Sequence, residues 1–274
     1  MRIYISPHTP RIVKDAITTL SQEGKGAALE EVLARLPSTP FSLLYKHTPD
    51  TSRGAVDWIS NQFDETRLET LQIVPVPHSE PWETVGMLSD IFKPKMMLGI
   101  FPAFLQIELR FHGAIRSLGM PVCTVVDKQI GAGVALIEEL RIGGIVLTQS
   151  LLASCMEEVR RANMTEPLYY QAITGLEEKN VLSVDSSATS RCRVFNEVHL
   201  IPGIIGFFQC PHLAEKGTTG FHPSDRFVWE FDGASAQVTD MRPAPLFSRT
   251  PLPRGVEVRD SRCPCGRTIE LSLT

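Results

Sequence analysis

The sequence predicts an α/β protein with a mostly parallel sheet and flanking helices, followed by a smaller and more antiparallel lobe. Two patterns carry this prediction. Between residues 101 and 162, segments with helical spacing alternate with short apolar segments, as in parallel sheets built from right-handed crossovers. After residue 193, strand candidates are separated by turns rich in glycine and proline. We therefore divide the chain into an amino-terminal part, 1–98, an α/β part, 99–200, and a β-rich lobe, 201–274.

Composition narrows the class of protein. The 274 residues are 43% hydrophobic, which is enough for a sizeable core, and the lack of a long uninterrupted apolar run argues against a membrane partner. A net charge of −4 without a concentrated basic region argues against a nucleic-acid partner. The first residues lack the apolar run of a signal peptide, so we expect a cytoplasmic protein. Six irregularly spaced cysteines indicate reduced thiols or metal ligands.

The first 98 residues are expected to form a helical region, a loop and a short helix, followed by one strand candidate. Helical spacing of apolar residues extends over 9–36 and is interrupted near Gly24 and Gly26. A polar loop precedes a short helix expected at 55–63. Residues 71–74 form a strand candidate, which the two prolines that follow are expected to end.

The middle of the chain has the clearest alternation of elements. We expect a helix at 101–118, a strand at 122–126, a helix at 133–140, a strand at 145–147 and a helix at 150–162. The first of these helices is expected to end at Gly119 and to bury Phe104, Leu105, Leu109, Phe111 and Ile115. The apolar strand that follows it is typical of a parallel sheet covered on both faces.

The last third of the chain changes character. Its strand candidates are 194–200, 226–231 and 256–258. Four prolines within 241–253 argue against a long regular element there. Short strands separated by such turns predict a lobe that is mainly antiparallel.

Cysteine and histidine residues near the carboxyl end give the strongest chemical signal. Cys263 and Cys265 are one residue apart, so a tight turn can bring both thiolates to one ion. Upstream, Cys210 with either His212 or His222 could complete a tetrahedral Cys₃His site. This set predicts a structural zinc ion, because it leaves no coordination position for water. The alternative is a pair of ordinary thiols in a turn.

Other motifs give weaker signals. Gly131 and Gly133 lie between a strand and a helix, but they lack the third glycine and the lysine of phosphate-binding loops. The serines near residue 187 lack a Gly-x-Ser-x-Gly motif, so a nucleophilic serine has no support. The neighbouring residues Glu138 and Glu139 point apart on a helix and cannot act on one substrate atom.

Several of these segments resemble the phenylacetate-CoA ligase-like branch of the adenylate-forming superfamily. The similarity runs through 109–164 and continues at Cys210, the Gly220-Phe221-His222 segment, Asp225 and Glu230. The run Cys263-Pro264-Cys265-Gly266-Arg267 reproduces the family's Cys-x-Cys-Gly-Arg motif. The resemblance implies that residues from 99 onward adopt the large-domain fold of that superfamily and that 1–98 are a degenerate first subdomain.

The same resemblance implies a particular metal site. In members of that family, a cysteine, a histidine and the Cys-x-Cys pair can hold zinc. Matching position by position selects Cys210, His222, Cys263 and Cys265, and leaves His212 as a spare. A zinc-stabilised carboxyl-terminal lobe is therefore expected.

Segments that serve nucleotide chemistry in the family are changed in this sequence. Residues 48–54 lack the clustered glycines and the lysine of the family's phosphate loop. The Tyr-Gly-x-Thr-Glu segment falls on 201–206 and keeps only Gly203, and the Arg-Thr-Gly-Asp segment keeps Arg249 but has Leu252 for aspartate. The sequence ends nine residues after Cys265, so we expect the mobile carboxyl-terminal domain with its catalytic lysine to be absent.

Two hypotheses of function follow. The first is a non-catalytic relative, a pseudoenzyme without catalytic residues, which uses structural zinc and binds a small acyl or aryl carboxylate, a partner protein or a second copy of itself. The second is a divergent AMP-forming carboxylate–CoA ligase that uses ATP and Mg²⁺ and is either completed by another chain or relies on different residues. Under the second hypothesis, the nucleotide-binding residues are Thr174, Gly175, Gly203 and Arg249. Changes at several separate segments favour the first hypothesis.

Overall fold

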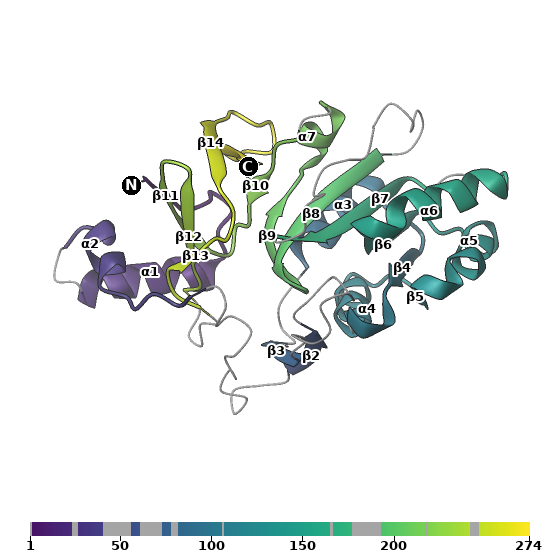
Figure 1. Cartoon of the computed structure of the whole chain (residues 1–274), viewed down its shortest axis with the longest axis horizontal. Helices are drawn as coiled ribbons and strands as arrows, with labels where there is room; N and C mark the ends of the chain where they lie inside the picture. The colour runs from purple at the N-terminus through teal and green to yellow at the C-terminus, as the bar shows by residue number, and fades with distance from the viewer. Residues whose placement is uncertain are drawn as a thin grey trace. The chain divides into compact units, whose positions relative to one another are not determined.

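The computed structural model describes most of the chain (Figure 1). The described residues are 2–23, 27–40, 56–60, 73–77, 82–105, 107–164, 167–176, 193–216, 219–241 and 247–274. They divide into two compact units. The terminal unit is Met1–Arg53 with Gly220–Thr274, and the central unit is Gly54–Thr219. The predicted three-part division of the chain stays a prediction.

The central unit alternates strands and helices along most of its length. Its elements are β2 (Val56–Ser60), β3 (Ile73–Pro77), α3 (Glu83–Phe92), β4 (Met97–Phe101), η4 (Ala103–Leu105), α4 (Glu108–Ser117), β5 (Val122–Val126), η5 (Asp127–Gln129), α5 (Ile130–Glu139), β6 (Gly144–Thr148), α6 (Gln149–Arg161), β7 (Tyr169–Gly175), β8 (Arg193–Ile201), β9 (Ile204–Phe208) and α7 (Pro211–Glu215). Within this unit the main sheet has the order β9-β8-β7-β6-β4-β5. Strands β5, β4, β6, β7 and β8 are parallel, and β9 runs antiparallel to β8. The predicted α/β fold with a mostly parallel sheet is confirmed.

Both faces of this sheet are buried, because neighbouring residues of each strand contact different helices. Met97 and Phe101 of β4 pack with α3 and α4, whereas Leu98 and Ile100 pack with α5 and α6, which lie side by side (Figure 1). Gly99 permits close packing of α4, since a Cβ atom there would lie 2.8 Å from the Phe111 ring. Continuous apolar strands such as β4 and β6 follow from this two-sided burial.

The terminal unit is built mainly from antiparallel strands. Its elements are β1 (Arg2–Tyr4), α1 (Arg11–Glu23), α2 (Leu29–Ala34), β10 (His222–Pro223), β11 (Val228–Asp232), β12 (Ser235–Thr239), β13 (Thr250–Pro251), β14 (Val256–Asp260) and β15 (Ile269–Leu273). One sheet has the order β1-β11-β12-β13, and β14 and β15 form a hairpin. The antiparallel character predicted for the last third is confirmed. Among the described residues, no helix has the length and apolar content needed to cross a bilayer.

The helix predicted at 55–63 is wrong. Residues Val56–Ser60 form β2, which pairs antiparallel with β3. Valine, tryptophan and isoleucine at 56, 58 and 59 favour a strand once a partner is available. The strand predicted at 71–74 is found instead at Ile73–Pro77 and is not ended by its prolines. A two-stranded ribbon has only edge strands, which tolerate residues without an N–H donor.

The helix predicted at 101–118 is also wrong in its first turns. Phe101 ends strand β4, and α4 begins only at Glu108. Pro102 explains the extended backbone, because a residue before proline is biased away from the helical region. Leu109, expected to be buried, is 62% exposed. It lies two positions, about 200° of helical rotation, from Phe111, which is fully buried.

Candidate metal centre

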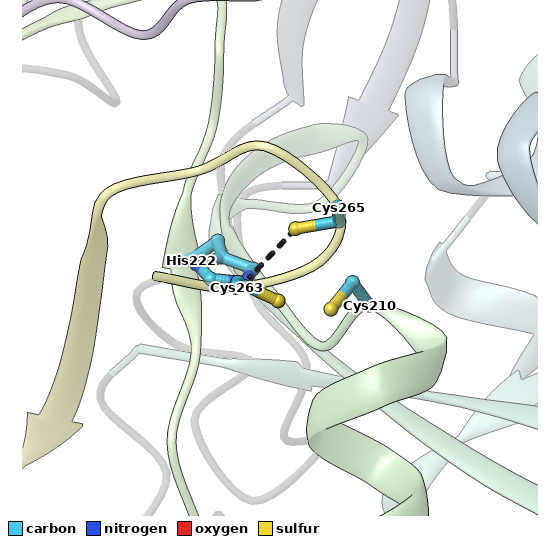
Figure 2. Close-up of side chains that lie close together, drawn as sticks. All are labelled: Cys210, His222, Cys263 and Cys265. Atoms are coloured by element: carbon cyan, nitrogen blue, oxygen red, sulfur yellow. Dashed lines mark hydrogen bonds between the residues drawn. The ribbon is translucent and has the colours of Figure 1, made fainter. Parts of the chain in front are cut away.

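The β14–β15 hairpin carries two of the predicted metal ligands in its connecting loop, residues 261–268, which we call the metal loop. The Cys263 amide donates to the Arg267 carbonyl oxygen at 3.2 Å, and the Gly266 amide donates to the Cys263 carbonyl oxygen at 2.9 Å. This turn needs a left-handed residue, and Gly266 has φ of 87°. The turn brings Cys263 and Cys265 to one side of the loop, as Figure 2 shows.

His222 reaches the same place from β10. Its neighbour Phe221 forms two backbone hydrogen bonds of 2.8 Å with Leu271 of β15, which fix the segment beside the hairpin. The Nδ1 atom of His222 lies 2.6 Å from the Ile269 carbonyl oxygen. Because a carbonyl only accepts, Nδ1 must carry the proton, and Nε2 presents its lone pair. This Nε2 atom is 3.4 Å from Cys265 Sγ (Figure 2).

Cys210, the fourth predicted ligand, is the residue before α7. Its carbonyl oxygen accepts from the amides of Leu213 and Ala214, and Pro211 is the first residue of the helix. The ligand atoms of Cys210, His222, Cys263 and Cys265 all lie within 4.8 Å of one another. A tetrahedral ion with metal–sulfur bonds of about 2.3 Å spaces its sulfur atoms by about 3.8 Å. The four predicted residues therefore form a group that could hold one metal ion.

Burial of this group favours a closed coordination sphere. The side chains of Cys210 and His222 are fully buried, Cys263 is 7% exposed, and Cys265 is half-buried. Four protein donors complete a tetrahedral sphere and leave no position for a reacting water molecule. His212, the spare candidate, lies on α7 and is not a member of the group.

A buried ion pair joins Arg267 of the metal loop to Asp225. Arg267 Nε donates to Asp225 Oδ1 at 3.0 Å, and its Nη2 donates to Asp225 Oδ2. Burial lowers the pKa of Arg267, but hydrogen bonds and charges from Asp225, and then from Cys265, raise that pKa above its usual value. The guanidinium is thus a permanent cation beside the Cys265 sulfur. Sequence reasoning included Asp225 and Arg267 in the resemblance but assigned them no role.

Three of the predicted nucleotide-binding residues lie at one edge of the central sheet. Thr174 and Gly175 end β7, and Gly203 lies in the turn from β8 to β9. Strands β7 and β8 are parallel, with Gly175 opposite His199 in register. Their carboxyl ends therefore meet at the edge where α/β sheets bind ligands.

Arg249, the fourth predicted nucleotide-binding residue, belongs to the terminal unit and has a structural contact. Its Nε donates to Glu230 Oε2 at 3.1 Å, and its guanidinium also reaches the Ala34 carbonyl oxygen at 3.4 Å. Arg249 has a positive φ of 42°, which is uncommon for a residue with a side chain. Its charge is paired with a carboxylate that is 3% exposed.

Sequence reasoning missed a buried polar network around Glu197 in β8. This carboxylate, 1% exposed, accepts from Trp82 Nε1 at 2.9 Å, from Gln171 Nε2 at 2.6 Å, from Thr84 and from His199 Nε2. The Gly203 amide donates to His199 Nδ1 at 2.9 Å, so the imidazole proton is on Nε2. The sequence did contain a signal for this network, since a glutamate and a histidine lie two residues apart in an apolar strand. Such residues are seldom fully buried without polar partners.

Known structures share the fold of this chain. The crystal structure of 2-hydroxyisobutyryl-CoA ligase in an open conformation, in complex with 2-HIB-AMP and CoA, matches 96% of this chain and 68% of the ligase chain, with a TM-score of 0.61 and 12% identity. The same ligase in its postadenylation state, in complex with 2-HIB-AMP, matches 94% of this chain and 65% of its own, with a TM-score of 0.60 and 11% identity. No model of a protein family and no curated protein matches the sequence.

The likeness confirms the fold inferred from the resemblance. The chain has a mixed α/β fold that matches the large domain of adenylate-forming enzymes and spans about two thirds of the length of the ligase. At 11–12% identity a shared fold does not carry activity with it. Function must therefore be argued from the residues of this chain.

Proposed function

We propose that this protein is a non-catalytic member of the adenylate-forming superfamily, close to its phenylacetate-CoA ligase-like branch, with a structural zinc ion. Its role is to bind a small acyl or aryl carboxylate, a partner protein or a second copy of the chain, in the cytoplasm. The observation that carries the proposal is the closed group of Cys210, His222, Cys263 and Cys265. No catalytic residue is assigned.

The choice of zinc follows from the chemistry of the four donors. Three thiolates and one imidazole are soft and borderline ligands, which suit zinc and disfavour magnesium or calcium. Zinc also accepts the tetrahedral arrangement without a preference from d electrons. The hydrogen bond from His222 to the Ile269 carbonyl oxygen orients the ring as in zinc sites held by an outer partner.

The turn around Gly203 supports the non-catalytic part of the proposal. Ile201–Ile204 contains no carboxylate that could hold magnesium, and the next residues of β9 point apolar side chains into the core. Ile204 and Phe207 are fully buried and Phe208 is 1% exposed. Charge that develops on a transferred phosphoryl group needs fixed cations or a metal ion for stabilisation. The residues of this turn supply neither.

A second function keeps one observation in its favour. Thr174, Gly175 and Gly203 lie together at the carboxyl edge of β7 and β8, where a nucleotide would bind in a sheet of this kind. On this alternative, the protein is a divergent AMP-forming carboxylate–CoA ligase that another chain completes, and it binds ATP and Mg²⁺. The paired state of Arg249 with Glu230 weighs against it.

Carboxylate-dependent pyrophosphate exchange separates the two functions. We expect purified protein with millimolar ATP, Mg²⁺ and a panel of acyl and aryl carboxylates to exchange no label above a reaction that omits the carboxylate. A ligand that binds only the folded state raises the melting temperature. Because the proposed protein binds no nucleotide, ATP and Mg²⁺ should leave its melting temperature unchanged. An active acyl-CoA ligase in parallel reactions controls for the reagents. Exchange that depends on one of the carboxylates would replace the proposal with the ligase.

Carboxylate binding and self-association need separate tests. A carboxylate ligand should raise the melting temperature by mass action as its concentration increases, without ATP. Sedimentation equilibrium over a range of protein concentrations reports a homodimer directly. If no carboxylate raises the melting temperature and the chain stays monomeric, the binding role passes to a different partner protein.

A further inference from the structure

The amino-terminal segment, residues 2–9, is held against the β14–β15 hairpin at both of its ends. Arg2 Nη2 donates to Asp260 Oδ1 at 2.6 Å, at the end of β14. Six residues later, His8 Nε2 lies 2.9 Å from the Cys265 carbonyl oxygen, so the imidazole donates to the metal loop. Arg2 belongs to strand β1, whereas His8 lies in a turn that the Thr9 amide closes by donating to the Ser6 carbonyl oxygen at 3.1 Å.

The middle of the segment is attached through buried polar groups. Ser6 Oγ donates to Asp225 Oδ1, and the same carboxylate accepts both hydrogen bonds of Arg267. Ser6, Asp225 and Arg267 are 2%, 5% and 9% exposed. Burial raises the pKa of Tyr4, with further effects from Ser6, Asp225, Arg267 and Cys265, so the phenol stays protonated next to this group. One carboxylate therefore joins the amino-terminal segment to the metal loop.

Gly266 adds a steric contact between the same two parts. A Cβ atom at this position would lie 3.0 Å from His8 Nε2 and 3.5 Å from its Cε1. The left-handed backbone at Gly266, with φ of 87°, turns the chain so that the Cys265 carbonyl oxygen meets the imidazole. His8 therefore contacts the metal loop in the same conformation that brings Cys263 and Cys265 together.

Charge can link a zinc ion on the metal loop to the amino-terminal segment. A zinc ion with three thiolates and a neutral imidazole has a net charge of −1, since three negative charges exceed the two positive ones. Arg267 is the buried cation beside Cys265, and Asp225 orients it by accepting hydrogen bonds from its Nε and Nη2 atoms. Ser6 in turn orients Asp225. Outer partners of this kind commonly change metal affinity by about 10- to 100-fold.

Strand β1 is held by its pairing with β11. We propose that the metal loop is the docking site of the part of the amino-terminal segment that follows β1, so that zinc on the loop stabilises the docked segment and the docked segment slows zinc release. This inference rests on the proposed zinc site. Asp225 and Arg267 are the positioning residues that link zinc binding to docking of the segment. His8 is the residue of the segment that contacts the metal loop. Because coupling between two binding equilibria is reciprocal, the factor by which zinc strengthens docking of the segment equals the factor by which the docked segment strengthens zinc binding.

Zinc release to an excess of a colorimetric chelator tests the coupling on the folded, zinc-loaded full chain. We expect His8→Ala to release zinc about 3- to 10-fold faster than the unchanged protein, because one hydrogen bond to the metal loop is lost. Asp225→Asn should release it about 10- to 100-fold faster. Asp15→Ala, an exposed change on α1 in the same unit, is the control and should release zinc at the original rate.

Hydrogen exchange of the same zinc-loaded proteins measures directly whether the segment is docked. Residues 2–9 should exchange faster in His8→Ala than in the unchanged protein, while α5 of the central unit keeps its protection. His8 is exposed, so this variant decides the question even if Asp225→Asn does not fold. If the unchanged protein holds zinc but both His8→Ala readouts equal those of the control, the coupling is overturned and the zinc site stands. If the unchanged protein binds no zinc, both the site and the coupling fall.

Discussion

At the residue scale, His222 shows how a side chain is prepared to bind a metal. The Ile269 carbonyl oxygen accepts a hydrogen bond from the protonated Nδ1, and this leaves the lone pair of Nε2 facing the sulfur of Cys265. The three cysteines could be predicted as one group from their residue type and spacing, whereas the choice of His222 over His212 came from the family resemblance. The tautomer could not be predicted, because it depends on the bridge that sets Phe221 against Leu271, and a backbone contact 50 residues away along the chain leaves no mark in composition.

Glu197 is the residue whose role differs most from expectation. It was part of a predicted strand and had no assigned function, yet four side chains donate to its carboxylate. A buried carboxylate of this kind is stable only while its donors remain in place. The network thereby ties the start of α3 to β7 and β8.

We expect Glu197→Gln to destabilise the protein by about 1–3 kcal/mol, because an amide cannot accept all four hydrogen bonds and leaves buried donors unsatisfied. Urea denaturation of the zinc-loaded protein, followed by fluorescence, measures this change. Glu157→Gln on the exposed face of α6 is the matched control and should change the free energy of unfolding by less than about 0.5 kcal/mol. Equal stability of the two variants would show that the network contributes nothing.

At the scale of elements, the strands and helices of the main sheet could be predicted best where one apolar pattern fills one element. Strand 122–126 is found with the expected bounds, and α6 lies close to the expected 150–162. The pattern failed at 101–118, where one apolar run serves the end of a strand, a 3₁₀ turn and a helix. It failed again at 55–63, because the strand there is selected by its pairing with β3, which local spacing does not contain.

Close packing of α4 on β4 provides a test at this scale. Gly99→Ala places a Cβ atom 2.6 Å from the Phe101 ring and 2.8 Å from the Phe111 ring, so the helix or the rings must move. We expect a loss of about 1–3 kcal/mol in the free energy of unfolding. Gly86→Ala on α3 makes no contact within 4 Å and should be neutral or stabilise by up to about 1 kcal/mol. Thermal and urea unfolding of the two variants side by side provide the measurement, and a stable Gly99→Ala would contradict the packing argument.

At the scale of the whole molecule, the α/β class and the antiparallel lobe followed from patterns of spacing, and the match to the ligase fold agrees with both. The division into units was harder to foresee. The terminal unit combines Met1–Arg53 with Gly220–Thr274, and residues so distant in the chain are brought together by strand pairing between β1 and β11. Strand β1 has only three residues, too few for a periodic pattern to be detected.

The zinc content of the purified protein tests the central claim most directly. Elemental analysis of the unchanged chain, produced with zinc present, should find about one zinc ion per chain, and Cys265→Ser should lose most of it because a serine hydroxyl is a much poorer zinc ligand than the thiolate it replaces. His212→Ala removes the spare histidine and should keep the full content. Zinc in Cys265→Ser at the level of the unchanged chain, or an unchanged chain that folds without zinc and melts at the same temperature with and without it, would contradict the account.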